Sequence, residues 1–202
     1  MRPVVASGLI ALAGACTAGA VLAQPERVTI SAHSLLVRDR VPTTVSGAIA
    51  SDQAGQLVTI EGKMCGQTFF TARAAAVTAA GGRWVAPRVL VGPGHTVLRA
   101  RWNDARSAEV TIRVRATVAI AILSRRVFRV HAYGFGRKRA NFERYEPALG
   151  RWRRVRSVVL EEDGVTDVRA SVRPKTLVRV VLPRSQASPC HLAGYSNLLR
   201  TS

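Results

Sequence analysis

Apolar and polar residues alternate along most of the chain after residue 27. Residues 110–115 read Val-Thr-Ile-Arg-Val-Arg, which places apolar side chains on one face of a strand and polar ones on the other. The same alternation recurs in residues 28–31, 118–122 and 178–182. Turn-forming residues separate such runs; they are Ser46-Gly47, Ala54-Gly55, Gly81-Gly82, Gly92-Pro93-Gly94, Asn103-Asp104, Asp163-Gly164 and Arg173-Pro174-Lys175. Short strands bounded by turns about every eight to twelve residues predict an all-β sandwich architecture.

Residues 69–80 are the stretch in which a helix competes with a strand, because the segment is rich in Ala. The β-branched side chains of Thr71, Val77 and Thr78 disfavour a helix. We therefore expect a strand that leads into the Gly81-Gly82 turn.

Short segments of the chain repeat, which predicts two related domains. The matching pairs are residues 55–61 with 136–143, 82–84 with 150–152, and 96–99 with 176–179. The first and third pairs are about 80 residues apart, whereas the second is 68 apart and requires an insertion or a chance match. The expected domains are residues 24–115 and 116–202. Since Val114 and Val118 share one register, we expect one strand to run nearly straight between them and to make a stiff rod.

The first 23 residues have the features of a secretory signal peptide. Arg2 supplies a positive charge, residues 4–22 are mostly apolar, and Val21 and Ala23 are small residues at the −3 and −1 positions of a cleavage site before Gln24. A signal peptide at residues 1–23 predicts a protein that is secreted or exposed on the extracytoplasmic cell surface.

Two alternatives to cleavage after residue 23 remain open. The apolar stretch is just long enough to stay in the membrane as an anchor, although its glycines weaken a spanning helix. Cys16 follows small residues and is similar to the lipidated cysteine of bacterial lipoproteins. Membrane attachment is therefore expected only through an uncleaved or lipidated N-terminus.

The mature chain would keep two cysteines, Cys65 in the first domain and Cys190 in the second. Exported proteins usually pair their thiols, so we expect a disulfide between Cys65 and Cys190 that fixes the angle between the domains. Two buried free thiols and a bond to another chain are the alternatives. A metal site that uses Cys190 and His191 is disfavoured, because two adjacent ligands rarely close a tetrahedral site.

Several motifs of the first domain follow one another in a familiar order. They are a Ser-Gly strand at residues 45–47, an Ala-Gly-Gln turn that opens a hydrophobic strand at 54–60, a Gly-x-Trp strand at 81–84, and Leu-Arg-Ala-Arg-Trp at 98–102. This series resembles the bacterial immunoglobulin-like or fibronectin-type modules of secreted actinobacterial proteins. The resemblance covers about residues 28–115 well and residues 116–197 more loosely.

That resemblance implies tandem immunoglobulin-like β-sandwich domains with a structural or adhesive role outside the cytoplasm. The chain departs from the antibody pattern, because Cys65 has no partner cysteine within its own domain. Trp84 and Trp102 are therefore expected to fill that core by apolar packing.

The chain is strongly basic, with 30 Lys and Arg against 12 Asp and Glu and a net charge of +18. Arginines and aromatic residues are interleaved in the second domain, which in a cytoplasmic protein would indicate nucleic-acid binding. The signal peptide argues against nucleic acid as a partner. We expect Arg151, Arg153, Arg154 and Arg156 to bind anionic cell-wall polymers or lipid head groups, with a steep dependence on salt.

The alternative is an Arg-rich solvated face that only keeps the protein soluble. In that interpretation Arg151 and Arg153 point outward and flank an inward-pointing Trp152.

No enzyme, metal or cofactor motif emerges from the sequence. The four histidines are scattered outside His-x-Glu or Gly-x-Ser-x-Gly contexts. The acidic run at residues 161–163 could offer oxygen ligands to calcium, yet Asp163-Gly164 favours a solvated hairpin. The Gly134-Phe135-Gly136 segment precedes no helix, so a phosphate-binding loop is not supported. We expect no cofactor.

Together these patterns predict a secreted, non-enzymatic structural or adhesive protein of the cell envelope. A carbohydrate-binding accessory protein that uses exposed aromatic residues is the main alternative, and a small hydrolase with an unrecognised site is a second. The oligomeric state does not follow from the sequence.

Overall fold

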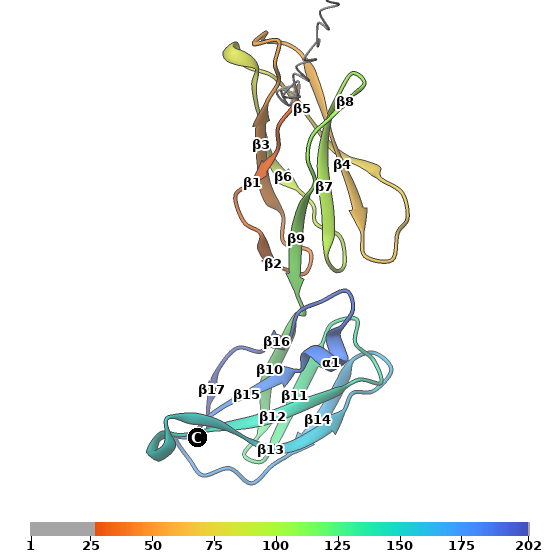
Figure 1. Ribbon diagram of the computed structural model, residues 1–202. Helices are drawn as coiled ribbons and strands as arrows, with labels where there is room; N and C mark the ends of the chain where they lie inside the picture. Colours follow the sequence, from red (N-terminus) through yellow and green to blue (C-terminus); the bar gives the residue numbers. More distant parts are fainter. Residues whose placement is uncertain (1–26, 202) are drawn as a thin grey trace, which may run out of the picture.

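The computed structural model describes residues 27–201, which form two β-sandwiches stacked end to end (Figure 1). The prediction of an all-β chain with two tandem sandwiches is confirmed. The signal peptide expected at residues 1–23, including Cys16, lies outside the described residues. Between residues 27 and 201 no helix is long and apolar enough to cross a membrane.

Domain 1 contains a three-stranded sheet packed against a six-stranded one. The smaller sheet has the order β1 (Ser31–Ala32), β3 (Thr43–Ala48) and β6 (Arg83–Val89). The larger has the order β2 (Leu36–Arg38), β9 (Val110–Arg115), β7 (Thr96–Trp102), β4 (Leu57–Met64) and β5 (Thr71–Val77), and β8 (Ala105–Arg106) pairs with β7. Residues 71–77 are thus a strand, as expected, and a 3-10 turn at Ala80–Gly82 follows.

The alternating apolar residues of both sheets meet in one core between them. Its buried members include Val45, Ile60, Trp84, Leu98 and Ile112. Trp84 is 1% exposed, whereas Trp102 is only partly buried and packs against the edge of this core. Both tryptophans therefore contribute apolar packing, as the sequence predicts.

Domain 2 pairs a three-stranded sheet with a five-stranded one. The smaller sheet has the order β10 (Val118–Ser124), β11 (Val127–Ala132) and β14 (Val165–Arg169). The larger has the order β13 (Arg151–Val159), β12 (Arg139–Glu146), β15 (Leu177–Leu182) and β16 (Gly194–Tyr195), and β17 (Leu199–Arg200) also pairs with β15. A 3-10 turn at Pro147–Leu149 and a short helix, α1 (Arg184–Ala187), complete it.

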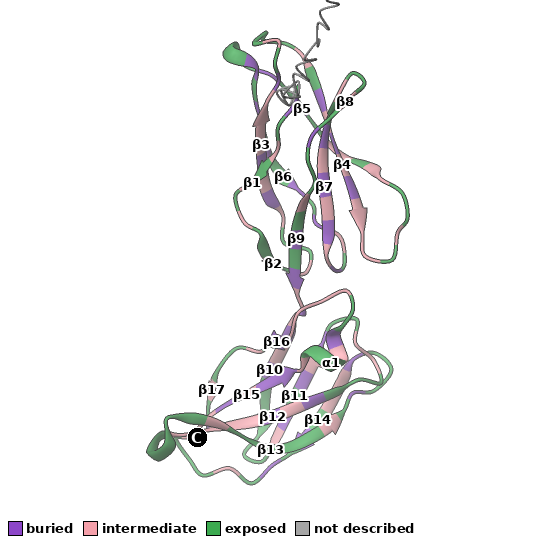
Figure 2. Ribbon diagram, viewed as in Figure 1, coloured by how far each residue is buried: buried purple, intermediate pink, exposed green. Residues whose placement is uncertain are grey.

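The core of domain 2 is separate from that of domain 1, and its largest members form an aromatic pair. The rings of Phe128 and Phe142 lie 4.9 Å apart between the two sheets, and both are at most 1% exposed. Figure 2 shows buried residues inside each sandwich, while β13 is exposed along most of its length.

The two domains share one strand arrangement, in which β4, β5, β6 and β7 correspond to β12, β13, β14 and β15. The sequence matches 80 residues apart are therefore structurally equivalent, because they place β12 on β4 and β15 on β7. The match between residues 82–84 and 150–152 is wrong, since it aligns the start of β6 with the start of β13.

One further equivalence has no counterpart among the sequence matches. The Ser107 hydroxyl accepts the Ala100 N–H at 2.9 Å, and the Ser196 hydroxyl accepts the Val180 N–H at 2.8 Å. Ala100 and Val180 are equivalent residues of β7 and β15, so each domain uses a serine to hold the segment that follows this strand.

The Asp163-Gly164 turn differs from the expected hairpin. It is a tight turn in which the Gly164 N–H donates to the Glu161 carbonyl at 3.0 Å. The strands on either side, β13 and β14, belong to different sheets of the sandwich. The turn therefore carries the chain from one sheet to the other.

Candidate functional site

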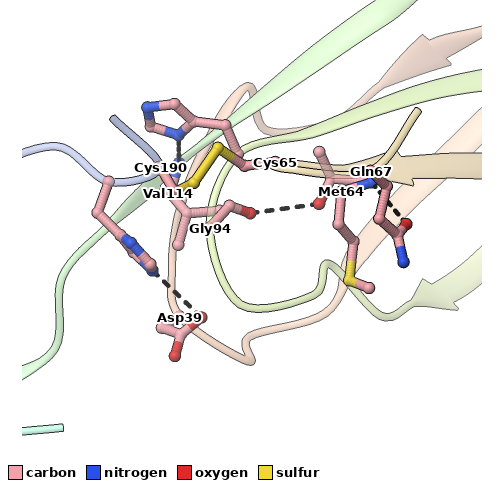
Figure 3. The surroundings of a disulfide bond; sticks show 10 residues. Asp39, Met64, Cys65, Gln67, Gly94, Val114 and Cys190 are labelled. Atoms are coloured by element: carbon pink, nitrogen blue, oxygen red, sulfur yellow. Dashed lines mark hydrogen bonds and ion pairs between the residues drawn. A yellow bond between two sulfur atoms is a disulfide. The ribbon is translucent and has the colours of Figure 1, made fainter. Parts of the chain in front are cut away.

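The ends of the two domains that face each other are joined by a covalent bond (Figure 3). Cys65 follows β4 and Cys190 follows α1, and their sulfur atoms form a disulfide with the Cα atoms 5.5 Å apart. The predicted pairing is confirmed. The bond connects positions 125 residues apart in sequence and one domain to the other.

Backbone hydrogen bonds reinforce this bond. The Cys65 N–H donates to the His95 carbonyl at 2.8 Å, and the His95 N–H donates to the Cys190 carbonyl at 2.7 Å. Gly94, with φ of +86°, makes the approach possible, because a Cβ there would lie 2.9 Å from the Cβ of Cys190. The turn at residues 92–94 thus brings domain 2 against domain 1.

The segment after Cys190 also binds the connection between β9 and β10. The Leu192 N–H donates to the Val114 carbonyl at 2.8 Å, and the Ala116 N–H donates to the Leu192 carbonyl at 3.1 Å. The Arg115 guanidinium donates to the Ala193 carbonyl at 3.1 Å. Since β9 ends at Arg115 and β10 begins at Val118, the chain passes almost directly from one sandwich to the next.

His95 lies at the centre of these contacts as a neutral hydrogen-bond acceptor. Its Nδ1 atom accepts the Val114 N–H at 2.8 Å, so the remaining proton is on Nε2. Burial lowers the pKa of His95, and the nearby His191 and Arg113 lower it further. Protonation of Nδ1 would break the bond to Val114.

We expect the stability of the protein to fall as the pH drops below about 6.5, in part because of His95. The folded-state pKa of His95 lies below its ordinary value of 6.5. Between the folded-state and unfolded-state pKa values the unfolded chain binds more protons than the folded one, so stability rises with pH. In His95→Asn the amide oxygen can accept the Val114 N–H without titrating. Thermal midpoints measured between about pH 5 and pH 7 should vary less for His95→Asn than for the original protein. Equal slopes would show that His95 does not contribute.

A second pair of polar groups links the domains beside the disulfide. His191 Nε2 lies 3.8 Å from Asp39 Oδ1, and neither atom has a hydrogen-bond partner or contact with solvent among the described residues. Burial lowers the pKa of His191, an effect that Asp39 partly offsets. The Phe135 ring packs edge-on against the imidazole with centroids 5.0 Å apart.

A cavity of about 680 Å³ opens next to this pair, between the domains. Domain 1 contributes the end of β2, the loop after it and the turn before β7, and domain 2 contributes the start of β10 and the turn after β11. Residues that line it include Arg38, Arg40, Pro93, Val118, Tyr133 and Phe135. Gly134 and Phe135 of the Gly134-Phe135-Gly136 segment thus form part of the cavity wall, a role that the sequence does not reveal.

The four arginines predicted to bind anions all lie on β13, an edge strand of the larger sheet of domain 2. Each is exposed. Arg153 forms an ion pair with Glu146 at 3.3 Å, and Arg156 donates to the Arg169 carbonyl at 2.9 Å. Across residues 27–201, the side chains of Arg151 and Arg154 form no hydrogen bond or ion pair.

These arginines do not share one face of the strand. Trp152 is opposite Tyr145 and Arg154 is opposite Glu143, so both lie on the outer face of the sheet, whereas Phe142 on the same neighbouring strand faces the core. The expectation that Trp152 points inward is wrong. The bulge between the pairs of Phe142 and Glu143 changes the alternation along β13.

Trp152 belongs to a cluster on this outer face. Arg179 donates to Glu143 at 2.8 Å, and its guanidinium lies 4.2 Å from the centre of the Trp152 ring and 5.2 Å from that of Tyr195. The ring of Tyr145 is tilted by 56° relative to Trp152. These aromatic side chains are therefore not coplanar, and an arginine covers the tryptophan.

Domain 1 carries the equivalent arrangement. Arg99, which corresponds to Arg179, donates to Glu61 at 2.8 Å and lies 3.8 Å from the centre of the Phe70 ring. Arg101 donates to the other Glu61 oxygen at 2.8 Å. Burial opposes ionisation of Glu61, but the two hydrogen bonds outweigh it and lower its pKa. A Glu–Arg pair on neighbouring strands, with an aromatic ring against the guanidinium, is thus a repeated feature of the larger sheets.

The other residues considered as metal ligands or catalytic groups already make contacts with neighbouring residues. Glu162 pairs with Arg137 at 2.7 Å, Asp163 accepts the Val165 N–H at 2.9 Å, and His131 stacks on Tyr133 with ring centroids 3.5 Å apart. In the described part of the chain, no three His, Cys, Asp or Glu residues are grouped closely enough to hold a metal ion.

Comparisons with known proteins find similar solved structures but no sequence match. No protein-family profile matches the chain, and no curated protein matches its sequence. A tetra-tandem repeat in the extending region of a large adhesion protein matches with a TM-score of 0.38 and 12% identity, over 87% of this chain and 49% of that one. The FN1–FN3 domains of chicken CNTN1 match with a TM-score of 0.25 and 13% identity, over 83% of this chain and 60% of that one. The chain thus spans about half to three fifths of these two structures.

Proposed function

We propose that this protein is an exported, non-enzymatic spacer or adhesive element of the cell envelope, in which two β-sandwiches are held at a fixed angle. The observation that carries the proposal is the disulfide between Cys65 and Cys190, which joins the domains rather than the sheets of one domain. Disulfides of this kind form and persist in oxidising compartments, which agrees with the signal peptide expected at residues 1–23.

The contacts around the disulfide support a rigid junction. Domain 2 is connected to domain 1 by the chain itself, by the disulfide and by the hydrogen bonds of His95 and Leu192. A junction with several such attachments has little hinge freedom. A rod of fixed shape can hold a binding partner at a defined distance from the cell surface.

Residual dipolar couplings test this proposal. In the oxidised protein, both domains should report one common alignment tensor, because they tumble as one body. In Cys65→Ser/Cys190→Ser the two tensors should diverge and the scattering-derived size distribution should broaden. One shared tensor in both proteins would mean that the disulfide is not what fixes the angle.

We further propose that the exposed arginines of β13 attract anionic polymers of the cell wall or lipid head groups. Arg151 and Arg154 support this proposal most strongly, because neither forms an ion pair with an acid of the described chain. Arg153 and Arg156 are already engaged with Glu146 and the Arg169 carbonyl. A net charge of +18 would draw polyanions toward the protein over about a Debye length.

Retention on immobilised heparin, measured as a function of salt, tests the arginines. Arg151→Ala/Arg154→Ala should decrease the slope of log affinity against log salt by about 1.5, the value for two lost phosphate-type contacts. Arg153→Ala/Arg156→Ala should change it less. Arg83→Ala/Arg88→Ala removes the same charge from β6 and is the matched control. If all three pairs reduce retention equally, only net charge matters and the site on β13 is rejected.

On the outer face of the larger sheet of domain 2, the alternative of a carbohydrate-binding accessory protein finds less support. Such proteins stack sugars on exposed aromatic rings, yet Arg179 covers Trp152 and the Tyr145 ring is tilted away from it.

A further inference from the structure

We propose that the cavity between the two domains binds a small anion that carries a flat, apolar ring face, either an acidic sugar unit or an aromatic carboxylate. This site is distinct from the arginines of β13. Its volume of about 680 Å³ falls within the range of about 300–1,000 Å³ that is typical of ligand sites, which often lie between domains.

The domain 1 wall supplies positive charge. Arg38, the last residue of β2, and Arg40, in the loop that follows it, line the cavity. The Arg38 side chain forms no ion pair within residues 27–201. Arg40 is 86% exposed, and its Nε atom lies 4.0 Å from Asp39 Oδ2, a long separation for an ion pair. Asp39 cannot neutralise both arginines, because its other oxygen faces His191. Two guanidinium groups on one rim favour a carboxylate.

The domain 2 wall supplies a surface for a ring. Tyr133 is 47% exposed at the rim, and the ring of His131 stacks behind it at 3.5 Å, so the phenol is held in place by packing. Val118 and Ala119 of β10 form the adjacent apolar part of the wall. Aromatic side chains of this kind pack against the apolar face of a sugar or an aromatic acid.

Neither domain forms the cavity alone. The arginines belong to domain 1, whereas Tyr133, Val118 and Ala119 belong to domain 2. The cavity therefore depends on the angle that the disulfide and its neighbouring contacts maintain. Binding should weaken when that angle is released, although neither cysteine lines the cavity.

The proposal is tested by amide chemical-shift titration of the oxidised protein with two pairs of probes. Digalacturonate is compared with neutral galactobiose, and benzoate with benzamide. One anion should shift the amides of Thr117, Ala119 and Gly134, while its neutral counterpart should bind at least tenfold more weakly. The anion that binds identifies the sugar or the aromatic source. Absence of shifts with both anions at millimolar concentration would overturn the proposal.

Matched variants separate this site from general charge attraction. Arg38→Ala/Arg40→Ala should weaken binding at least tenfold, and Arg125→Ala/Arg126→Ala, at the turn between β10 and β11, should change it less than twofold. Equal effects of both pairs would overturn the proposal.

Cys65→Ser/Cys190→Ser should also weaken binding at least tenfold. If that variant keeps both the common alignment tensor and the binding, the proposed role of the disulfide fails while the site stands. If the tensors diverge and binding is unchanged, the interdomain site is rejected.

Discussion

Cys65→Ser/Cys190→Ser is expected to unfold with a free energy about 4–5 kcal/mol below that of the oxidised protein. The disulfide closes a loop across a sequence separation of 125 residues. Closing a loop of that length lowers the conformational entropy of the unfolded chain, which raises the free energy of unfolding by about 4–5 kcal/mol. Chemical denaturation of both proteins measures the difference. Because each domain has its own core, the transitions of the two domains should be fitted separately.

A second double variant controls for the side chains that replace the cysteines. Cys65→Ala/Cys190→Ala should lose a similar free energy, because the effect belongs to the connection and not to the new residue. A loss below about 1 kcal/mol in both variants would contradict the loop-entropy explanation.

Trp84→Ala is expected to destabilise domain 1 by about 3–5 kcal/mol, the usual cost of removing a large aromatic side chain from a core. Trp84 is 1% exposed. Its ring packs so closely against β3 that a Cβ at Gly47 would lie 2.6 Å from the Trp84 Cζ2 atom. The thermal midpoint of domain 1 should fall, whereas that of domain 2 should change little.

Trp84→Phe is the matched variant for this prediction. The Trp84 Nε1 is buried and has no hydrogen-bond partner in the described chain, and such an unpaired donor costs about 1–3 kcal/mol. Phenylalanine removes that cost while keeping most of the ring, so its loss should be well below that of alanine. Equal losses would contradict the prediction, because they would mean that the size of the cavity has no effect on stability.

The strands could be predicted from local patterns, because a strand with one buried face requires alternation in its own sequence. Residues 110–115 became β9, and Ile112 and Val114 are fully buried, as the alternation requires. The local sequence of β13 predicts its exposed and buried faces less well. Its alternation is interrupted by a bulge, and it lies at a sheet edge where even Val155 is exposed.

The sequence matches between the two domains reflect a shared structure only where the matched residues make the same contacts. Residues 96–99 and 176–179 match because Arg99 and Arg179 each bind a glutamate on the neighbouring strand. The match of Trp84 with Trp152 reflects no shared environment, since Trp84 is buried and Trp152 lies under an arginine on the outer face.

The junction could be predicted only in part. Two cysteines in a chain that is expected to be exported were enough to predict their pairing. The cavity was not predictable, because Arg38, Pro93 and Tyr133 lie far apart in sequence and meet only through the docking of two domains. The interaction of His191 with Asp39 is equally non-local, and no spacing rule marks it.

The position of the disulfide also bears on how the molecule responds to tension. If the ends of the described chain are pulled apart, the force passes through the sulfur atoms and bypasses the chain between two cysteines that are 125 positions apart. Every core residue of domain 2, from Ala116 to Ala187, lies inside the bypassed segment. Roughly 400 Å of contour length is thereby withheld from extension. Strands β10 to β15 of the second sandwich would carry no load, whereas β1 to β4 of the first and β16 and β17 of the second lie in the loaded path. The protein would behave as a short tether.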